Sequence, residues 1–309
     1  QDPIAVTGGE FRNGRGHSNL GWEPCGCAGI GQSHEPLCSR EGRLVRVDGD
    51  RNGHDRGNLR WKIWCNGIGP SGLSASELGS LAFMEQLAAG IHQVSKGVNA
   101  FVIDGDEGVV LVDTGLPKRH GSILDGLSAI GRNPGDIVGI VITHGHTDHA
   151  GGAAALKRES GAEVVASEGD APVVRGERPA PAPPVLDFPL LRGLARLVPA
   201  AEGVSVDQSV SEGRLSLVPD LTVVPTPGHT AGHISLLLDR HGGVMFAGDS
   251  AMSTRSGGVQ RGFMNRKSAT FDSSLRTMAD LEFDIACFGH SAAIVGGAAA
   301  SFRAFVSRI

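Results

Sequence analysis

Short apolar runs alternate with polar turns along most of the chain, and their lengths predict a mixture of strands and helices. Apolar runs of strand length predict β-strands at 98–103, 109–112, 137–142, 163–166, 221–224, 234–238, 244–247 and 285–288. Apolar positions at helical spacing predict helices at 121–130, 153–160, 273–281 and 298–306. Because strand pairs occur in both halves with helices between them, we expect an α/β fold in which two sheets pack together with helices outside.

A proline-rich segment interrupts this pattern. Residues 179–189 contain five prolines and predict an extended surface connection. Four leucines at helical spacing follow, namely Leu190, Leu191, Leu194 and Leu197. This apolar face either packs on its own domain or covers a pocket, and the wider stretch Val185–Val198 could line a pocket for an acyl chain.

Residues 1–83 differ in composition from the rest of the chain. They hold all three tryptophans, four of the five cysteines and a balanced set of charges, and only Leu44–Val47 predicts a strand. The first methionine is Met84. We therefore expect two parts: an irregular N-terminal extension over 1–83 that is poorly structured or not native, and a catalytic domain over 84–309.

Two alternatives give the extension a structural role. Its cysteines could bind zinc with nearby histidines, or form two disulfides; the residues concerned are Cys25, Cys27, Cys38, Cys65, His17, His34 and His54. Their spacing lacks the paired Cys-x₂₋₄-Cys clamps of a standard zinc knuckle. Alternatively, Trp22, Trp61 and Trp64 could bury apolar surface against the catalytic domain.

Composition excludes several classes of protein. In a chain of 309 residues, 40% hydrophobic and 20% charged residues are typical of a soluble globular protein, which excludes disorder and fibrous repeats. The net charge of −5 and the lack of a basic cluster argue against nucleic acid as a partner. No apolar run reaches the ~20 residues that span a bilayer, and no signal peptide opens the sequence, so we expect a cytoplasmic protein without a membrane partner.

The strongest chemical signal is Thr143-His144-Gly145-His146-Thr147-Asp148-His149, which follows an apolar strand. A turn at this point can direct His144 and His146 to one place and Asp148 and His149 to a neighbouring one. Imidazole and carboxylate ligands suit zinc and also iron or manganese. The motif therefore predicts metal binding without selecting the metal.

Three further residues occur in the same context, at the end of an apolar strand followed by a tight loop: His229, Asp249 and His290. Each alone would be an ordinary loop residue. Together with the first motif they supply five histidines and two aspartates, which is enough for two metal sites.

These motifs resemble those of the metallo-β-lactamase-fold hydrolase superfamily, in the order Asp113-Thr114-Gly115, 144–149, His229, Asp249 and His290. The resemblance covers about residues 85–309 and implies an αββα sandwich. It implies that His144, His146 and His229 bind a first metal, that Asp148, His149 and His290 bind a second, and that Asp249 bridges the two. It also implies that Asp113 supports the site from beneath.

The resemblance implies two divalent metal ions, with zinc as the expected metal and iron or manganese as alternatives. Two such ions about 3.5–4 Å apart can share a bridging hydroxide that attacks an ester carbonyl. We expect the catalytic residue Asp148 to orient this hydroxide and to carry a proton to the leaving group. His233 either supports the site or caps the next strand, and Cys287 is expected in the core.

The substrate is expected to be a small-molecule ester, with a lactone as the first choice, as in the lactonase and glyoxalase II-like branch of the superfamily. A bridging aspartate such as Asp249 favours this branch over true β-lactamases. Only nineteen residues follow His290, which is too few for the glutathione-binding extension of glyoxalase II, and the absence of tyrosine weakens the match to lactonases. Thioester hydrolysis, weak β-lactamase activity and a mono-iron sulfur dioxygenase-like activity are the alternatives.

Overall fold

We describe the fold from a computed structural model. It describes four short strands before residue 65, and then residues 83–95, 98–180, 200–262, 265 and 268–309. The chain divides into two compact units, Gln1–Ser74 and Ala75–Ile309.

The first unit contains one antiparallel sheet in the order β1-β2-β3-β4. Its strands are β1 (Glu23–Pro24), β2 (Leu37–Cys38), β3 (Leu44–Asp48) and β4 (Arg60–Trp64). Strand β3 confirms the strand predicted at Leu44–Val47. The suggested zinc site, disulfides and tryptophan contacts depend on side chains outside the described residues, so these ideas stay predictions.

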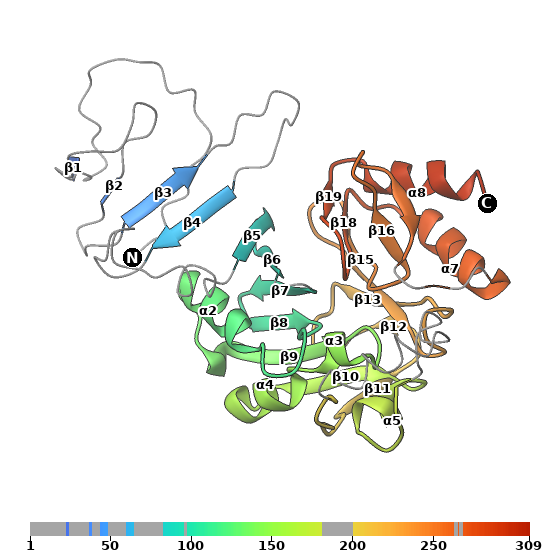
Figure 1. Ribbon diagram of the computed structural model, residues 1–309, viewed down its shortest axis with the longest axis horizontal. Helices are drawn as coiled ribbons and strands as arrows, with labels where there is room; N and C mark the ends of the chain where they lie inside the picture. The colour runs from blue at the N-terminus through green and yellow to red at the C-terminus, as the bar shows by residue number, and fades with distance from the viewer. Residues whose placement is uncertain are drawn as a thin grey trace, which may run out of the picture. The chain divides into compact units, whose positions relative to one another are not determined.

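The second unit begins with a seven-stranded sheet in the order β11-β10-β9-β8-β7-β6-β5 (Figure 1). Its strands are β5 (Phe83–Ala88), β6 (Ile91–Ser95), β7 (Asn99–Gly105), β8 (Gly108–Val112), β9 (Ile137–Ile142), β10 (Glu163–Ser167) and β11 (Gln208–Val210). Strands β5 to β8 pair antiparallel, whereas β8 to β11 run parallel. The carboxyl ends of β8, β9 and β10 therefore lie at one edge of this sheet.

A six-stranded sheet follows in the order β12-β13-β14-β15-β18-β19. Its strands are β12 (Gly213–Arg214), β13 (Leu221–Pro225), β14 (Ile234–Leu238), β15 (Val244–Phe246), β18 (Ile285–Cys287) and β19 (Ile294–Val295). A separate two-stranded sheet pairs β16 (Ala251–Ser253) with β17 (Val259–Arg261). Because β13, β15 and β18 point the same way, the loops that follow them leave from one edge.

The helices of the second unit are short and connect or cover the strands. They are α2 (Gly121–Ala129), η1 (Pro134–Asp136), α3 (Thr147–Ala150), α4 (Ala153–Ser160), α5 (Ala171–Val174), α7 (Ala269–Ala279) and α8 (Ala298–Val306). Ser268 caps α7 by accepting a hydrogen bond from Phe271 N. Among the described residues, no helix has the length and apolar character needed to cross a membrane.

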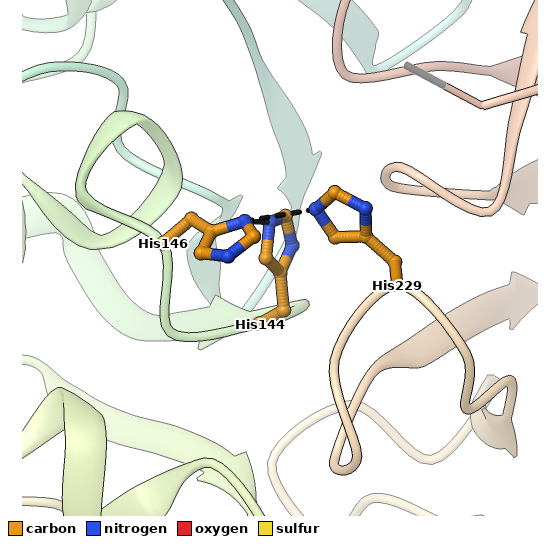
Figure 2. A group of neighbouring side chains, drawn as sticks. All are labelled: His144, His146 and His229. Atoms are coloured by element: carbon orange, nitrogen blue, oxygen red, sulfur yellow. Dashed lines mark hydrogen bonds between the residues drawn. The ribbon is translucent and has the colours of Figure 1, made fainter. Parts of the chain in front are cut away.

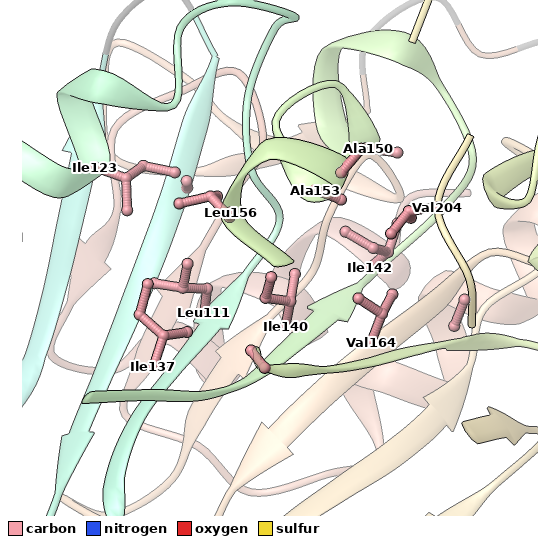
Figure 3. Close-up of a cluster of buried hydrophobic side chains, with 14 of the residues drawn as sticks. Leu111, Ile123, Ile137, Ile140, Ile142, Ala150, Ala153, Leu156, Val164 and Val204 are labelled. Carbon is pink, nitrogen blue, oxygen red and sulfur yellow. The ribbon is translucent and has the colours of Figure 1, made fainter. Parts of the chain in front are cut away.

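Three buried clusters show the layer order. One lies between the seven-stranded sheet and α2 and α4, and Figure 3 shows Ile123 and Leu156 of these helices beside Leu111 and Ile140 of the sheet. A second joins the inner faces of the two sheets, and a third packs α7 and α8 on the six-stranded sheet. This arrangement is the predicted αββα sandwich.

Strand alternation explains why the central strands read as continuous apolar runs. In β8, Leu111 belongs to the helix-facing cluster, whereas Val110 and Val112 belong to the inter-sheet cluster. Successive side chains of a strand point to opposite faces, so a strand covered on both faces needs apolar residues at every position. Cys287 lies in the inter-sheet cluster and is fully buried, which confirms its expected core position.

One expectation about the start of the sheet is wrong. The strand pattern in the sequence begins only near residue 91, where β6 starts, but the additional strand β5 precedes it. Met84 lies within β5 opposite Val94, and its side chain packs against the helix-facing cluster. The predicted helix over Leu190–Leu197 and the pocket-lining stretch Val185–Val198 lie outside the described residues.

The position of β5 determines how much of the N-terminal part can be removed without loss of stability. A protein that begins at Ala75 should melt like the full chain and keep its activity, because it retains the complete seven-stranded sheet. A protein that begins at Met84 places a charged amino terminus within β5, and should fold but melt about 2–8 °C lower. Thermal melts of the three proteins check this. If the protein beginning at Ala75 aggregates or loses activity, residues 1–74 belong to the catalytic fold.

Candidate metal centre

The predicted site residues all lie just beyond the carboxyl ends of central strands. His144 and His146 follow β9, whereas Asp148 and His149 lie in α3. His229, Asp249 and His290 follow β13, β15 and β18, respectively. The two sheets thus bring residues separated by up to 146 positions to one edge of the sandwich.

The first cluster consists of His144, His146 and His229, whose imidazole rings point toward one another (Figure 2). His146 Nδ1 lies 3.0 Å from His144 Nε2 and 2.8 Å from His229 Nε2. His144 is fully buried, and the other two are partly exposed. Three ring nitrogens from two loops therefore converge on one point.

The second cluster consists of Asp148, His149 and His290. His290 Nε2 lies 3.4 Å from Asp148 Oδ2 and 3.3 Å from His149 Nε2. The Asp148 side chain is 33% exposed, so this cluster opens toward solvent on one side.

Asp249 lies between the two clusters and contacts both. Its Oδ2 is 3.4 Å from His229 Nε2 and 3.2 Å from His290 Nε2, while Oδ1 is 3.3 Å from His149 Nε2. Asp249 Oδ1 is buried and, within the described residues, accepts no hydrogen bond. A buried carboxylate oxygen without a hydrogen-bond donor is costly unless a cation approaches it.

Three histidine rings make hydrogen bonds through Nδ1 that direct the opposite nitrogen, Nε2, into the site. His149 Nδ1 lies 2.8 Å from Asp113 Oδ2, and His229 Nδ1 lies 2.9 Å from Asn265 Oδ1. Both partners are acceptors, so each Nδ1 carries a proton and each Nε2 faces the site. In the same way, His144 Nδ1 can donate to Thr143 Oγ1, 3.1 Å away.

Asp113 holds this arrangement from beneath, as the resemblance implies. Its carboxylate accepts hydrogen bonds from Thr143 N and Thr143 Oγ1 as well as from His149. Its backbone has φ = 60°, a left-handed conformation that is uncommon for a residue other than glycine. Such strain persists where the surroundings fix it and is concentrated at functional sites.

The pKa values show that the first cluster favours neutral rings. Burial lowers the pKa of His144 well below its usual value, with further lowering from the neighbouring histidines. Burial likewise lowers the pKa of His229 to about 4, against an opposing effect of Asp249. Neutral imidazoles are the form that binds metal ions.

The second cluster and Asp249 instead attract positive charge. Burial opposes ionisation of Asp148, but the hydrogen bond with His290 outweighs it and lowers the pKa to about 2. Burial also opposes the charge of His290, yet hydrogen bonds with Asp148 and Asp249 raise its pKa to about 9. Without a cation, protons on the histidines compensate the negative charge of the carboxylates. A divalent cation could replace these protons.

Converging ring nitrogens, the ionised carboxylates and the unsatisfied Asp249 Oδ1 together fit divalent cations. All seven predicted ligands meet here, in groups whose ligand atoms lie within 4.8 Å of one another. Nitrogen and oxygen donors of this kind suit zinc, and also iron or manganese.

Gly289 makes the close approach of these side chains possible. A Cβ at this position would lie 2.3 Å from Asp249 Oδ1 and 2.6 Å from His149 Cε1. The glycine in the Phe288-Gly289-His290 sequence therefore serves packing of the site rather than turn geometry alone.

Replacing Gly289 with Ala should consequently weaken cation binding. We expect a loss of about 1–3 kcal/mol, the usual cost of forcing an extra methyl group into a packed site. Zinc titration of the purified variant measures this. Gly121→Ala is the matched control, because a Cβ at Gly121 would contact nothing within 4 Å. Equal zinc affinity of both variants would contradict the steric argument.

His233 supports the site, which decides between the two roles considered for it. Asp249 N donates to His233 Nε2 at 3.1 Å, and the opposite nitrogen Nδ1 lies 2.9 Å from Thr226 Oγ1. Burial lowers the pKa of His233 well below its usual value. The neutral ring therefore fixes the backbone of Asp249 without being a candidate ligand.

Three residues near the site are not among the residues predicted from the sequence. Asn265 orients His229, Asp170 contacts the loops of the first cluster, and Asn99 contacts the turn that bears His290. Asp170 follows the apolar strand β10, which is the same context that identified His229 and Asp249, so this signal was available. Nothing in the sequence around Asn99 or Asn265 distinguishes them from ordinary polar residues.

The remaining histidines of the second unit lie outside the site. His92 is buried in β6, and burial lowers its pKa. His120 pairs with Glu159 at 3.2 Å, and His241 Nε2 donates to Ala89 O. These three are surface or core histidines and not candidate ligands.

Comparison with known proteins agrees with the fold. The sequence profile of the metallo-beta-lactamase superfamily matches residues 96–290, which is more than half of the chain. The chain belongs to this superfamily. It is similar to the crystal structure of BJP-1, a subclass B3 metallo-beta-lactamase of Bradyrhizobium japonicum, with a TM-score of 0.51 and 27% identity; the match covers 70% of this chain and 81% of that chain.

Curated relatives have several functions. The probable metallo-hydrolase YflN of Bacillus subtilis (strain 168) is 28% identical over 54% of this chain and 66% of its own length. An N-acyl homoserine lactonase of a Bacillus species is 23% identical, and the match covers 62% of this chain and 79% of the lactonase. A hydroxyacylglutathione hydrolase of Cereibacter sphaeroides is 32% identical, and the match covers 49% of this chain and 47% of that hydrolase. The chain spans 53–66% of the length of three Bacillus subtilis relatives.

Proposed function

We propose that this protein is a dinuclear metal-dependent hydrolase that cleaves small-molecule esters, with lactones as the preferred class. The observation that carries the proposal is the place of Asp249, whose two oxygens lie 3.2–3.4 Å from histidines of both clusters. A single buried carboxylate shared by two donor clusters suits a pair of cations better than one.

In this proposal each cluster holds one cation. His144, His146 and His229 bind the first, Asp148, His149 and His290 bind the second, and Asp249 contacts both. We expect zinc, with iron or manganese as alternatives. Two such cations supply Lewis acidity and lower the pKa of water toward neutrality. The chain itself then needs no nucleophilic serine or cysteine, and the buried Cys287 thiol, whose pKa is raised by burial, is unsuited to that role.

Asp148 is the proposed catalytic carboxylate. It lies in the first turn of α3 and has a 33% exposed side chain, so it can reach both the second cluster and an incoming substrate. Because its pKa is lowered to about 2, the group is ionised at neutral pH and can accept a hydrogen bond from the attacking water. This favours the orienting role, and transfer of a proton to the leaving group is the second part of the proposal.

We prefer lactones to thioesters as substrates because this chain matches more of a lactonase relative than of a thioester hydrolase relative. The N-acyl homoserine lactonase is matched over 79% of its length, but the hydroxyacylglutathione hydrolase over only 47%, although the latter is more similar within the matched part. Both relatives act on an activated acyl carbon, which is the chemistry that a pair of cations supports.

A substrate panel tests this proposal directly. The zinc-loaded protein is assayed with lactones, p-nitrophenyl esters, glutathione thioesters and β-lactams, beside the same protein stripped by a chelator. We expect metal-dependent hydrolysis with the largest kcat/KM for a lactone. A larger value for thioesters or β-lactams would overturn the substrate class, and one iron per chain with no hydrolysis would overturn the hydrolase itself.

A further inference from the structure

Asn99 connects the seven-stranded sheet to the turn that bears His290. It is the first residue of β7, and its backbone N–H donates to Gly289 O at 2.8 Å. Its side-chain Nδ2 donates to Phe288 O at 2.7 Å and to Ser291 O at 2.8 Å. One buried residue therefore binds the backbone on both sides of His290, across about 190 positions of sequence.

Asp170 makes an analogous set of contacts to the first cluster. It lies after β10, is 4% exposed, and its Oδ2 accepts from Gly145 N at 2.9 Å and from Thr230 Oγ1 at 2.6 Å. Its Oδ1 accepts from Gly232 N at 3.2 Å. Gly145 lies between His144 and His146, and Thr230 follows His229, so one carboxylate binds both loops of the first cluster.

Close backbone packing strengthens the connection at Asp170. A Cβ at Gly232 would lie 2.5 Å from Asp170 N, and a Cβ at Gly145 would lie 2.8 Å from Val173 Cβ. The two histidine-bearing loops thus rest directly on the segment that begins with Asp170. The Asp170 carboxylate thus binds the loops of the first cluster, whereas Asn99 binds the turn of the second.

We propose that Asn99 and Asp170 are positioning residues, each for one of the two cation sites: Asp170 for the site of His144, His146 and His229, and Asn99 for the site that includes His290. This inference rests on the proposed function. In neither case does the residue touch a cation or the substrate; it acts by holding ligand-bearing backbone in place.

The physical reason is the entropy of ordering loops. Ligands on a loop that is already fixed lose little freedom when a cation binds, whereas ligands on a loose loop must be ordered at that moment. A carboxylate can accept several backbone N–H hydrogen bonds at once, which suits Asp170 to this role. Removal of groups that support metal ligands commonly costs 10–100-fold in affinity.

The test uses Asn99→Ala and Asp170→Asn in the full chain, titrated with zinc in competition with a chromophoric chelator. Asp170→Asn preserves shape but replaces one acceptor oxygen with a donor NH₂ group. We expect each variant to weaken one zinc site about 10–100-fold and to leave the other within about threefold. Matched controls are Asn133→Ala and Asp207→Asn; both residues are exposed, and Asp207 Oδ2 accepts from Val164 N at 2.7 Å.

Ligand variants identify which site has weakened. In a His146→Ala background the remaining zinc occupies the second site, so Asn99→Ala should weaken it about 10–100-fold, whereas Asp170→Asn should not. In a His290→Ala background the pattern should reverse. Asn99→Ser, whose hydroxyl can donate to one of the two carbonyls, should be intermediate, and it replaces Asn99→Ala if that variant fails to fold.

Two results would overturn the inference while leaving the proposed function intact. One is equal weakening of both sites by either variant, and the other is unchanged zinc affinity with only a lower melting temperature of the metal-free protein. If instead the wild-type chain binds fewer than two zinc ions, the proposed function itself has failed. The wild-type titration therefore separates the two failures.

Discussion

Replacing His146 with Ala should remove one of the two zinc ions and at least about 99% of the hydrolytic activity, since losing a direct ligand costs more than the 10–100-fold loss of a supporting group. His146 Nδ1 lies within 3.0 Å of both other ring nitrogens of the first cluster, so its removal leaves two ligands where three converge. His146 is only half-buried in a loop, so the fold should not depend on it.

Three measurements decide this first prediction. Elemental analysis after zinc loading should fall from two ions per chain to about one, kcat/KM should fall at least about 100-fold, and the metal-free melting temperature should stay within about 2 °C of wild type. His120→Ala is the control, because His120 is a histidine of similar exposure that pairs with Glu159 away from the site. If His146→Ala retains both ions and full turnover, the first cluster is not a metal site.

Much of the fold could be predicted because its central strands are covered on both faces. Strands β9 and β14 match the predicted 137–142 and 234–238 in full, and helices α4 and α8 match 153–160 and 298–306. Continuous apolar runs bounded by turn residues are strong local signals. The αββα order follows from them, and the superfamily match agrees with it.

The missed elements lacked such local signals. The strand pattern begins near residue 91, but the limits of β6 could not be predicted, because the buried polar residues His92 and Gln93 interrupt its apolar run. Strands β16, β17 and β19 have only two or three residues. Elements of this kind exist because neighbouring strands offer hydrogen-bond partners, and tertiary pairing of that sort leaves no periodicity in the sequence.

The residues of the site also divide into those that the sequence could predict and those that it could not. All seven candidate ligands could be named because histidine and aspartate at strand ends are chemically distinctive, and the structure brings them together. The supporting residues Asn99 and Asn265 could not be named, because they act through carbonyl groups or rings far along the chain. An asparagine that binds a backbone 189 positions away resembles any other asparagine in the sequence.

The second large effect is expected at Asp249. Asp249→Asn should impair the second cation and the pairing of the two cations far more than it impairs folding. The substitution preserves shape but removes the negative charge that both clusters share. Loss of one partner from a buried charged group commonly costs about 3–5 kcal/mol, which corresponds to a fall of about 10²–10⁴-fold in affinity at about 1.4 kcal/mol per factor of ten.

Metal-free and metal-loaded proteins should respond to this substitution in different ways. Without cations, Asp249 carries a buried oxygen that accepts no hydrogen bond among the described residues, so removing the charge relieves a desolvation cost as well as losing attractions to the histidines. The metal-free variant should therefore melt within a few degrees of metal-free wild type, whereas zinc should raise its melting temperature much less.

Zinc titration, melting with and without zinc, and kcat/KM for the best ester substrate together test this expectation. Asp220→Asn is a suitable control, since Asp220 is a partly buried carboxylate that pairs with Arg240 and contacts neither cluster. If Asp249→Asn retains two tightly bound zinc ions and full turnover, another carboxylate links the sites. If the metal-free variant instead melts many degrees below metal-free wild type, Asp249 serves the fold rather than the cations. A residue kept for metal binding stabilises chiefly the metal-loaded state.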